Sequence, residues 1–140
     1  MRTFALRLHP GQDPRRELAA FAREHNLQAA FVLTCVGSLR RAALRLANQP
    51  HTDYFDAKYE ICSLVGTLSP DGPHLHVMLS DGRGVGLGGH LQEGSEIYTT
   101  AEIVLGELED LSFSRPIDPE TTYDELLVSP RAAAPGGETA

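Results

Sequence analysis

The chain has 140 residues, which is enough for one domain and too short for two ordinary ones. Its 41% hydrophobic and 22% charged residues are typical of a globular protein and exclude the disordered and fibrous classes. The 12 basic and 19 acidic side chains give a net charge of −7, which argues against direct binding to duplex DNA, because such binding depends on neutralising phosphates.

One strand and one helix are predicted at the N-terminus. Residues 3–8 alternate between apolar and more polar side chains, which is typical of a half-buried strand. Asp13 followed by Pro14 predicts an N-cap and a first helical position. The apolar stripe that follows carries this helix to residues 25–26.

The rest of the chain is predicted to form short strands separated by turns, with a turn at Gly37–Ser38 and a polar loop over 48–53. In chain order, the expected strands cover residues 30–36, 42–47, 59–68, 74–80, 85–90, 97–105 and 108–115. The pattern indicates an α+β domain over residues 1–128, with one main helix near the N-terminus and a mostly antiparallel mixed β-sheet. Residues 129–140 have nothing to bury and are expected to form a disordered tail.

No segment of the sequence is expected to enter a membrane. The longest mostly apolar run, residues 29–37, is about half of what a bilayer crossing requires, and the N-terminus lacks the apolar core of a signal peptide. Cys35 and Cys62 both lie in apolar stretches and do not form a disulfide framework. We therefore expect a cytoplasmic protein.

Three of the six histidines cluster in the sequence. His74 and His76 are two residues apart on an expected strand, so their side chains leave the same face about 7 Å apart. A three-residue loop over 81–83 would place His90 opposite His74 on that face, whereas a two-residue loop would turn it away. Three neutral imidazoles leave a fourth tetrahedral position of a zinc ion open. The same spacing also suits surface histidines that hold no ligand.

Glycines at positions 84, 86, 88 and 89 indicate a bulge or a close backbone approach next to His90. Cupin barrels also place a carboxylate and a later histidine after a His-x-His motif. Here the first carboxylate, Asp81, falls in the expected turn, and the early helix is unlike that fold. The cupin barrel is therefore the lesser structural alternative.

Several blocks in order resemble the PPC (plants and prokaryotes conserved) domain, which accompanies AT-hook motifs in plant nuclear proteins. The matching blocks are residues 59–68, 72–77, 88–91, 98–106 and 118–126. The resemblance implies an α+β fold assembled as a homotrimer. The same fold superfamily holds acetolactate decarboxylase and zinc-dependent ester hydrolases, whose zinc ligands match His74, His76 and His90. The resemblance thus implies a zinc cofactor at these three residues.

Catalysis at such a metal would need further side chains. Glu60 lies in an otherwise apolar strand that is expected to neighbour the histidine strand, and from there it could transfer protons at the metal. The sequence fits equally well with Glu60 on the solvent side of its own strand. Arg45 could anchor a substrate carboxylate, since a guanidinium matches that geometry, or it could be solvated. The first functional hypothesis is therefore a zinc-dependent hydrolase or lyase acting on a small carboxylate or ester.

Two other functional hypotheses stay open. One is a non-catalytic oligomerisation or regulatory module of the kind linked to DNA-binding proteins, and the other is a stable domain whose histidines are unoccupied. The chain lacks the Arg-Gly-Arg-Pro core of an AT-hook, because Arg83–Gly84 is followed by Val85. The expected partners are other copies of this chain and a small carboxylate or ester, but neither DNA nor a membrane.

Overall fold

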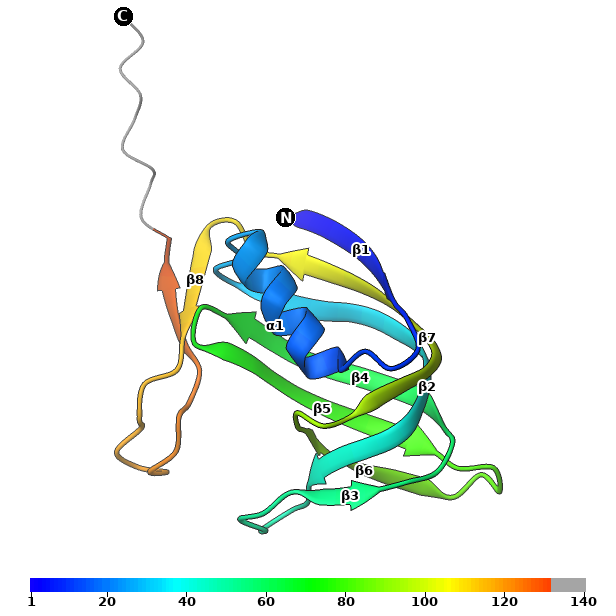
Figure 1. The fold of residues 1–140 in the computed structure, drawn as a ribbon. Helices are drawn as coiled ribbons and strands as arrows, with labels where there is room; N and C mark the ends of the chain where they lie inside the picture. Colours follow the sequence, from blue (N-terminus) through cyan, green and yellow to red (C-terminus); the bar gives the residue numbers. More distant parts are fainter. Residues whose placement is uncertain (132–140) are drawn as a thin grey trace, which may run out of the picture.

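The computed structural model describes residues 1–131, which form one helix and nine strands (Figure 1). The elements are β1 (Arg2–Leu8), α1 (Pro14–Glu24), β2 (Ala30–Arg45), β3 (Asp53–Phe55), β4 (Tyr59–Ser69), β5 (Gly72–Ser80), β6 (Gly86–Leu91), β7 (Glu96–Glu107), β8 (Leu111–Ser114) and β9 (Leu127–Pro130). In this part of the chain, no helix has the length and apolar character needed to cross a bilayer.

The strands form a seven-stranded sheet in the order β1-β7-β2-β4-β5-β6, with β3 paired to β2, and a separate two-stranded sheet of β8 and β9. Every registered strand pair within residues 1–131 is antiparallel, which confirms the predicted antiparallel character but not its mixed part. The C-terminal end of β2 also pairs with β6. The strands β2, β4, β5 and β6 therefore close into a ring, and α1 lies across the sheet (Figure 1).

The long strand β2 corrects one prediction. We expected a turn at Gly37–Ser38, but β2 runs without interruption from Ala30 to Arg45. A Cβ atom on Gly37 would lie 2.1 Å from the carbonyl oxygen of Thr100, and the pairing of β2 with β7 shifts register just after this glycine. The glycine therefore marks a bulge where two strands approach closely, and the bulge bends the strand rather than ending it.

The hydrophobic core lies between α1 and the sheet. Asp13 caps the helix by accepting hydrogen bonds from the backbone N–H groups of Arg15 and Arg16, as predicted, and Leu18 and Ala22 on the inner side of the helix are buried. Along β5 the residues at 75, 77 and 79 are buried leucine or valine, and those at 76 and 78 are exposed. This alternation sends the side chains of the β5 histidines to the side of the sheet away from the core.

Two short strands were not predicted. The strand β3 lies at the end of the segment expected to be a polar loop, and β9 carries the ordered chain two residues beyond the expected domain boundary at residue 128. The buried carboxylate of Glu107 holds this end in place, because it accepts hydrogen bonds from Arg2, Gln28 and Arg131. The remainder of the expected disordered tail, residues 132–140, lies outside the described residues.

Candidate metal centre

Neighbouring strands place the three predicted histidines on one face. His74 and His76 lie on β5, and His90 lies on β6 directly opposite His76. The loop between these strands covers residues 81–85, so it has five residues rather than the expected three, and the partner of His90 is His76 instead of His74. An odd loop length still brings all three side chains to the same side of the sheet.

The carboxylate of Asp81 takes no part in this cluster. Its Oδ1 atom accepts hydrogen bonds from the backbone N–H groups of Arg83 and Val85, both at 2.8 Å, and so holds the loop between β5 and β6. A cupin-type ligand set, with a carboxylate after the His-x-His motif, is therefore not formed by this residue.

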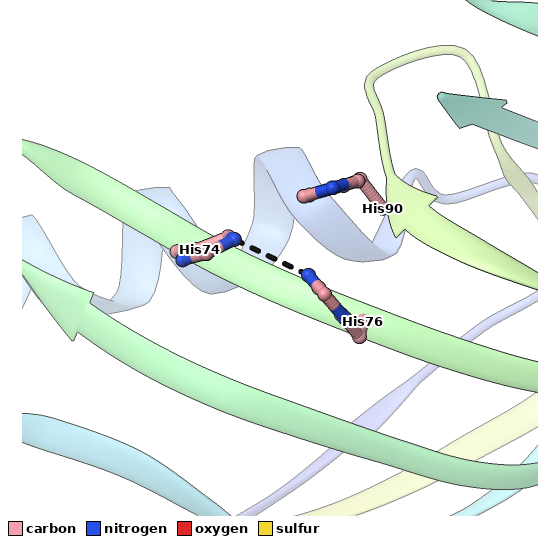
Figure 2. A group of neighbouring side chains, drawn as sticks. All are labelled: His74, His76 and His90. Carbon is pink, nitrogen blue, oxygen red and sulfur yellow. Dashed lines mark hydrogen bonds between the residues drawn. The ribbon is translucent and has the colours of Figure 1, made fainter. Parts of the chain in front are cut away.

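The geometry of the three imidazoles fits one metal ion (Figure 2). One nitrogen from each ring lies within 4.8 Å of the other two, and the Nε2 atoms of His74 and His76 are 3.3 Å apart. Two nitrogens bound to one zinc ion at a tetrahedral angle are about 3.3–3.4 Å apart, as follows from zinc–nitrogen bonds of about 2.0–2.1 Å. The β5 pair thus already has the spacing of two zinc ligands.

A glycine next to His90 lets β6 approach β2. A Cβ atom on Gly89 would lie 2.9 Å from the carbonyl oxygen of Arg45, which is tighter than a side chain tolerates. Arg45 itself pairs with His90 across the two strands. The predicted close approach beside His90 therefore exists, and it is made by the backbone of β2.

Arg45 also contacts the imidazole of His90 through its side chain. Its Nη2 atom donates a hydrogen bond of 2.9 Å to Nε2 of His90. A guanidinium can only donate, so Nε2 carries a lone pair and the ring is neutral. Desolvation, followed by the charge of Arg45, lowers the pKa of His90 to about 4. The lone pair engaged by Arg45 is of the kind that a metal ion requires.

The pKa of His74 is also lowered. Desolvation is the largest cause, and the positive charge of Arg115 adds to it, whereas the carboxylate of Glu125 opposes the shift. Metal ligation requires neutral imidazole, and both His74 and His90 are therefore held in the form that binds a metal at neutral pH.

His74 and His90 border an open hollow with a volume of about 570 Å³, which is the size of a site for a small ligand. Its lining is formed by Arg15, Arg45, Asn48, Pro73, His74, Leu75, His90, Gln92, Arg115, Tyr123, Asp124 and Glu125. A smaller hollow of about 220 Å³, lined in part by His74 and His76, adjoins it. Residues of the connection between β8 and β9, including Arg115 and Glu125, line both hollows.

Arg15 joins the two histidine strands beside the cluster. Its Nη1 atom donates to the carbonyl oxygen of Pro73 at 2.8 Å and to that of Leu91 at 3.4 Å. Pro73 directly precedes His74, and Leu91 directly follows His90. Arg15 therefore holds the backbone at both ends of the ligand set, and it brings a positive charge into the hollow.

The two other predicted site residues differ in their placement. Arg45 lines the large hollow and contacts His90. Glu60 lies opposite Ser80, four residues along β5 from His76, and lines a different hollow with Tyr98 and Thr99. Of the two alternatives considered for Glu60, this placement favours the one without a role in proton transfer at the histidines.

Sequence reasoning did not identify Arg15, Arg115 or Glu125 as site residues. Arg15 directly follows the predicted N-cap and first helical position, but nothing in the spacing shows that the start of the helix faces the histidines. Glu125 lies in residues 118–126, a block that resembles the PPC domain, and that resemblance was the available signal.

Comparison with known proteins places these features in a family. The family model of the Plants and Prokaryotes Conserved (PCC) domain matches residues 1–109. A hypothetical protein from Salmonella cholerae-suis is 46% identical, with a TM-score of 0.91 over 94% of this chain and 95% of that one. A metal-containing protein from Archaeoglobus fulgidus is 29% identical, with a TM-score of 0.75 over 91% of this chain and 94% of that one.

A curated relative of a different kind is the bifunctional protein GlmU of a Synechococcus strain. It is 50% identical to this chain over 135 residues, which are 96% of this chain and 21% of the relative. A second Synechococcus strain has a GlmU protein with the same identity over 134 residues. The chain thus spans about a fifth of the length of the curated relatives it matches.

Proposed function

Because this chain belongs to the Plants and Prokaryotes Conserved (PCC) domain family, the same family as the PPC domain that its sequence resembles, we propose that it works as a small metal-dependent domain of that family. The metal is zinc, held by His74, His76 and His90, and the activity is that of a hydrolase or lyase on a small carboxylate or ester. The working form is a homotrimer.

The observation that carries this proposal is the spacing of the imidazole nitrogens. A distance of 3.3 Å between Nε2 of His74 and Nε2 of His76, with a nitrogen of His90 within 4.8 Å of both, fits three ligands of one ion. The similarity to a metal-containing protein of Archaeoglobus fulgidus supports the same reading. Three protein ligands are the number found in catalytic rather than structural zinc sites.

Zinc bound by three imidazoles supplies a Lewis acid with one exchangeable coordination position. The chain's own residues supply the rest of the site. Arg15 fixes the backbone next to two of the ligands, and Arg45 and Arg115 present guanidinium groups to the hollow. Glu125 is half-buried, lines both hollows and is close enough to raise the pKa of His74. We assign proton transfer to Glu125, since it is the carboxylate placed beside the ligands.

The proposal is tested by metal analysis and turnover on the same preparations. Protein purified without an affinity tag should contain about one zinc per chain, and His76→Ala should lose it. His9→Ala is the matched control, because His9 is exposed in the turn after β1 and outside the cluster. Hydrolysis of p-nitrophenyl acetate should require the metal and fall in Glu125→Gln. Metal-free protein that does not take up zinc would contradict the proposal.

The homotrimer is supported by an apolar surface next to the site. Leu33, Val36, Val65 and Met78 are 45–59% exposed on β2, β4 and β5, and Val65 lies opposite His76. Contiguous exposed apolar side chains mark contact surfaces. Light scattering of the purified protein should give three times the mass of the chain, and a monomer would contradict this part of the proposal.

A second candidate function is a non-catalytic oligomerisation or regulatory module. The observation in its favour is that the Synechococcus GlmU proteins contain a similar region as about a fifth of a longer chain. We propose no direct contact with DNA, because the net charge is −7 and six arginines are paired with carboxylates. A trimer without zinc or esterase activity would favour the module, and tight, salt-sensitive DNA binding in a gel shift would contradict the charge argument.

A further inference from the structure

The large hollow gathers arginines that form no salt bridge with a carboxylate among the described residues. Six arginines elsewhere in residues 1–131 form ion pairs with carboxylates, but Arg15, Arg45 and Arg115 form none. Their hydrogen bonds go to backbone carbonyl oxygens and to the neutral ring of His90. Three arginines thus line one hollow without forming a salt bridge to a carboxylate.

The charge of the hollow has the opposite sign to that of the protein. The three arginines contribute +3, and the carboxylates of Asp124 and Glu125 in the same lining contribute −2, so the side chains sum to +1. A divalent ion on the histidines would raise this sum to +3. The whole chain has a net charge of −7. A positive hollow in an acidic protein attracts small anions selectively.

The size and layout of the hollow favour an anion with two separated charges. Arg15 comes from α1, Arg45 from β2 and Arg115 from the connection after β8, so the guanidinium groups approach from three elements. The volume of about 570 Å³ exceeds what a single acetate or phosphate group fills. Planar guanidinium groups bind carboxylates through two parallel hydrogen bonds.

We infer that this hollow binds a small dicarboxylate, with Arg45 and Arg115 as its anchoring residues. The inference rests on the proposed function and names the ligand class of the same site. Arg45 would change its partner on binding: once Nε2 of His90 holds a metal ion, the released guanidinium would be free to turn to the carboxylate. Metal and dicarboxylate should therefore strengthen each other's binding.

Isothermal titration with succinate, acetate and inorganic phosphate tests the inference, on both metal-free and zinc-loaded protein. Succinate should bind more tightly than acetate or phosphate, and more tightly with zinc than without. Arg115→Gln should weaken succinate binding about tenfold or more, since a charged hydrogen bond contributes at least as much free energy as a tenfold change in affinity requires. Arg7→Gln is the matched control, because Arg7 is exposed on β1 outside the hollow.

Several results would overturn the inference. Equal succinate affinity in Arg115→Gln and Arg7→Gln would remove Arg115 from the site, and Arg45→Gln provides a second variant if the first fails to fold. Phosphate binding tighter than succinate would contradict the dicarboxylate class. Titration with zinc alone tests the proposed function separately, which fails if zinc does not bind. The inference is then decided by the effect of Arg115→Gln on succinate binding to the metal-free protein.

Discussion

We expect Arg45 to compete with a metal ion for Nε2 of His90, and this competition can be measured. Nη2 of Arg45 lies 2.9 Å from Nε2 of His90. A metal ion on that nitrogen must displace the hydrogen bond, and it also experiences the positive charge of the guanidinium. Arg45→Leu removes the donor and the charge together, so we expect tighter binding of zinc.

The magnitude follows from the contact itself. A half-exposed hydrogen bond from a charged donor contributes about 1–2 kcal/mol, which corresponds to a five- to thirtyfold gain in zinc affinity when it no longer has to be broken. Competition titration against a chromogenic chelator measures the affinity directly, with Arg7→Leu as the control on β1. An affinity equal to or weaker than that of the wild type in Arg45→Leu would refute the competition.

Three further predictions concern the fold and its titrating groups. Gly66→Ala should lower the free energy of unfolding by about 3 kcal/mol or more, because φ is +146° and the new Cβ atom would lie 2.0 Å from a carbonyl oxygen of β5. Gly82→Ala is the control, since its new Cβ atom would have no other atom within 4 Å, and it should change the urea unfolding midpoint little. Equal midpoints for the two variants would contradict this prediction. The metal-free protein should lose stability as the pH falls from about 6.5 towards 4, because His90 has a pKa of about 4 when folded and binds a proton more readily when unfolded. The loss of stability should be smaller in His90→Gln. An identical pH dependence of stability in the variant and the wild type would contradict this prediction. A thiol reagent at pH 8 should label the exposed Cys62 first, since desolvation raises the pKa of Cys35 to about 11. Equal labelling rates for Cys35 and Cys62 would contradict this prediction.

The fold class and the histidine face could be predicted because both depend on local patterns. The capping residue Asp13 and the apolar stripe after it defined α1, and the two-residue spacing of His74 and His76 fixed their common face. The side of the sheet taken by His90 depended only on whether the loop length was odd. The loop length itself was wrong, because the hydrogen bonds of Asp81 that hold a five-residue loop leave no clear mark in the sequence.

The remainder of the site depends on contacts between distant segments. Arg15 and Arg115 are 100 positions apart, and each is held at the hollow by hydrogen bonds to backbone carbonyl oxygens, which any residue type can provide. The sequence around Gly37 predicts a turn, because glycine allows unusual backbone conformations in turns and in bulges alike. Only the close pairing of β2 with β7 shows that this position is a bulge. Glu60 lies in an apolar strand as expected, but the register of β4 against β5 carries it away from the cluster.

The central claim is that His74, His76 and His90 hold one metal ion. Crystals of the protein grown with zinc, measured on both sides of the zinc absorption edge, test it most directly. We predict a single anomalous peak per chain among the three rings, about 2.0–2.1 Å from one nitrogen of each. A peak elsewhere in the chain, or none between the rings in zinc-saturated crystals, would contradict the account.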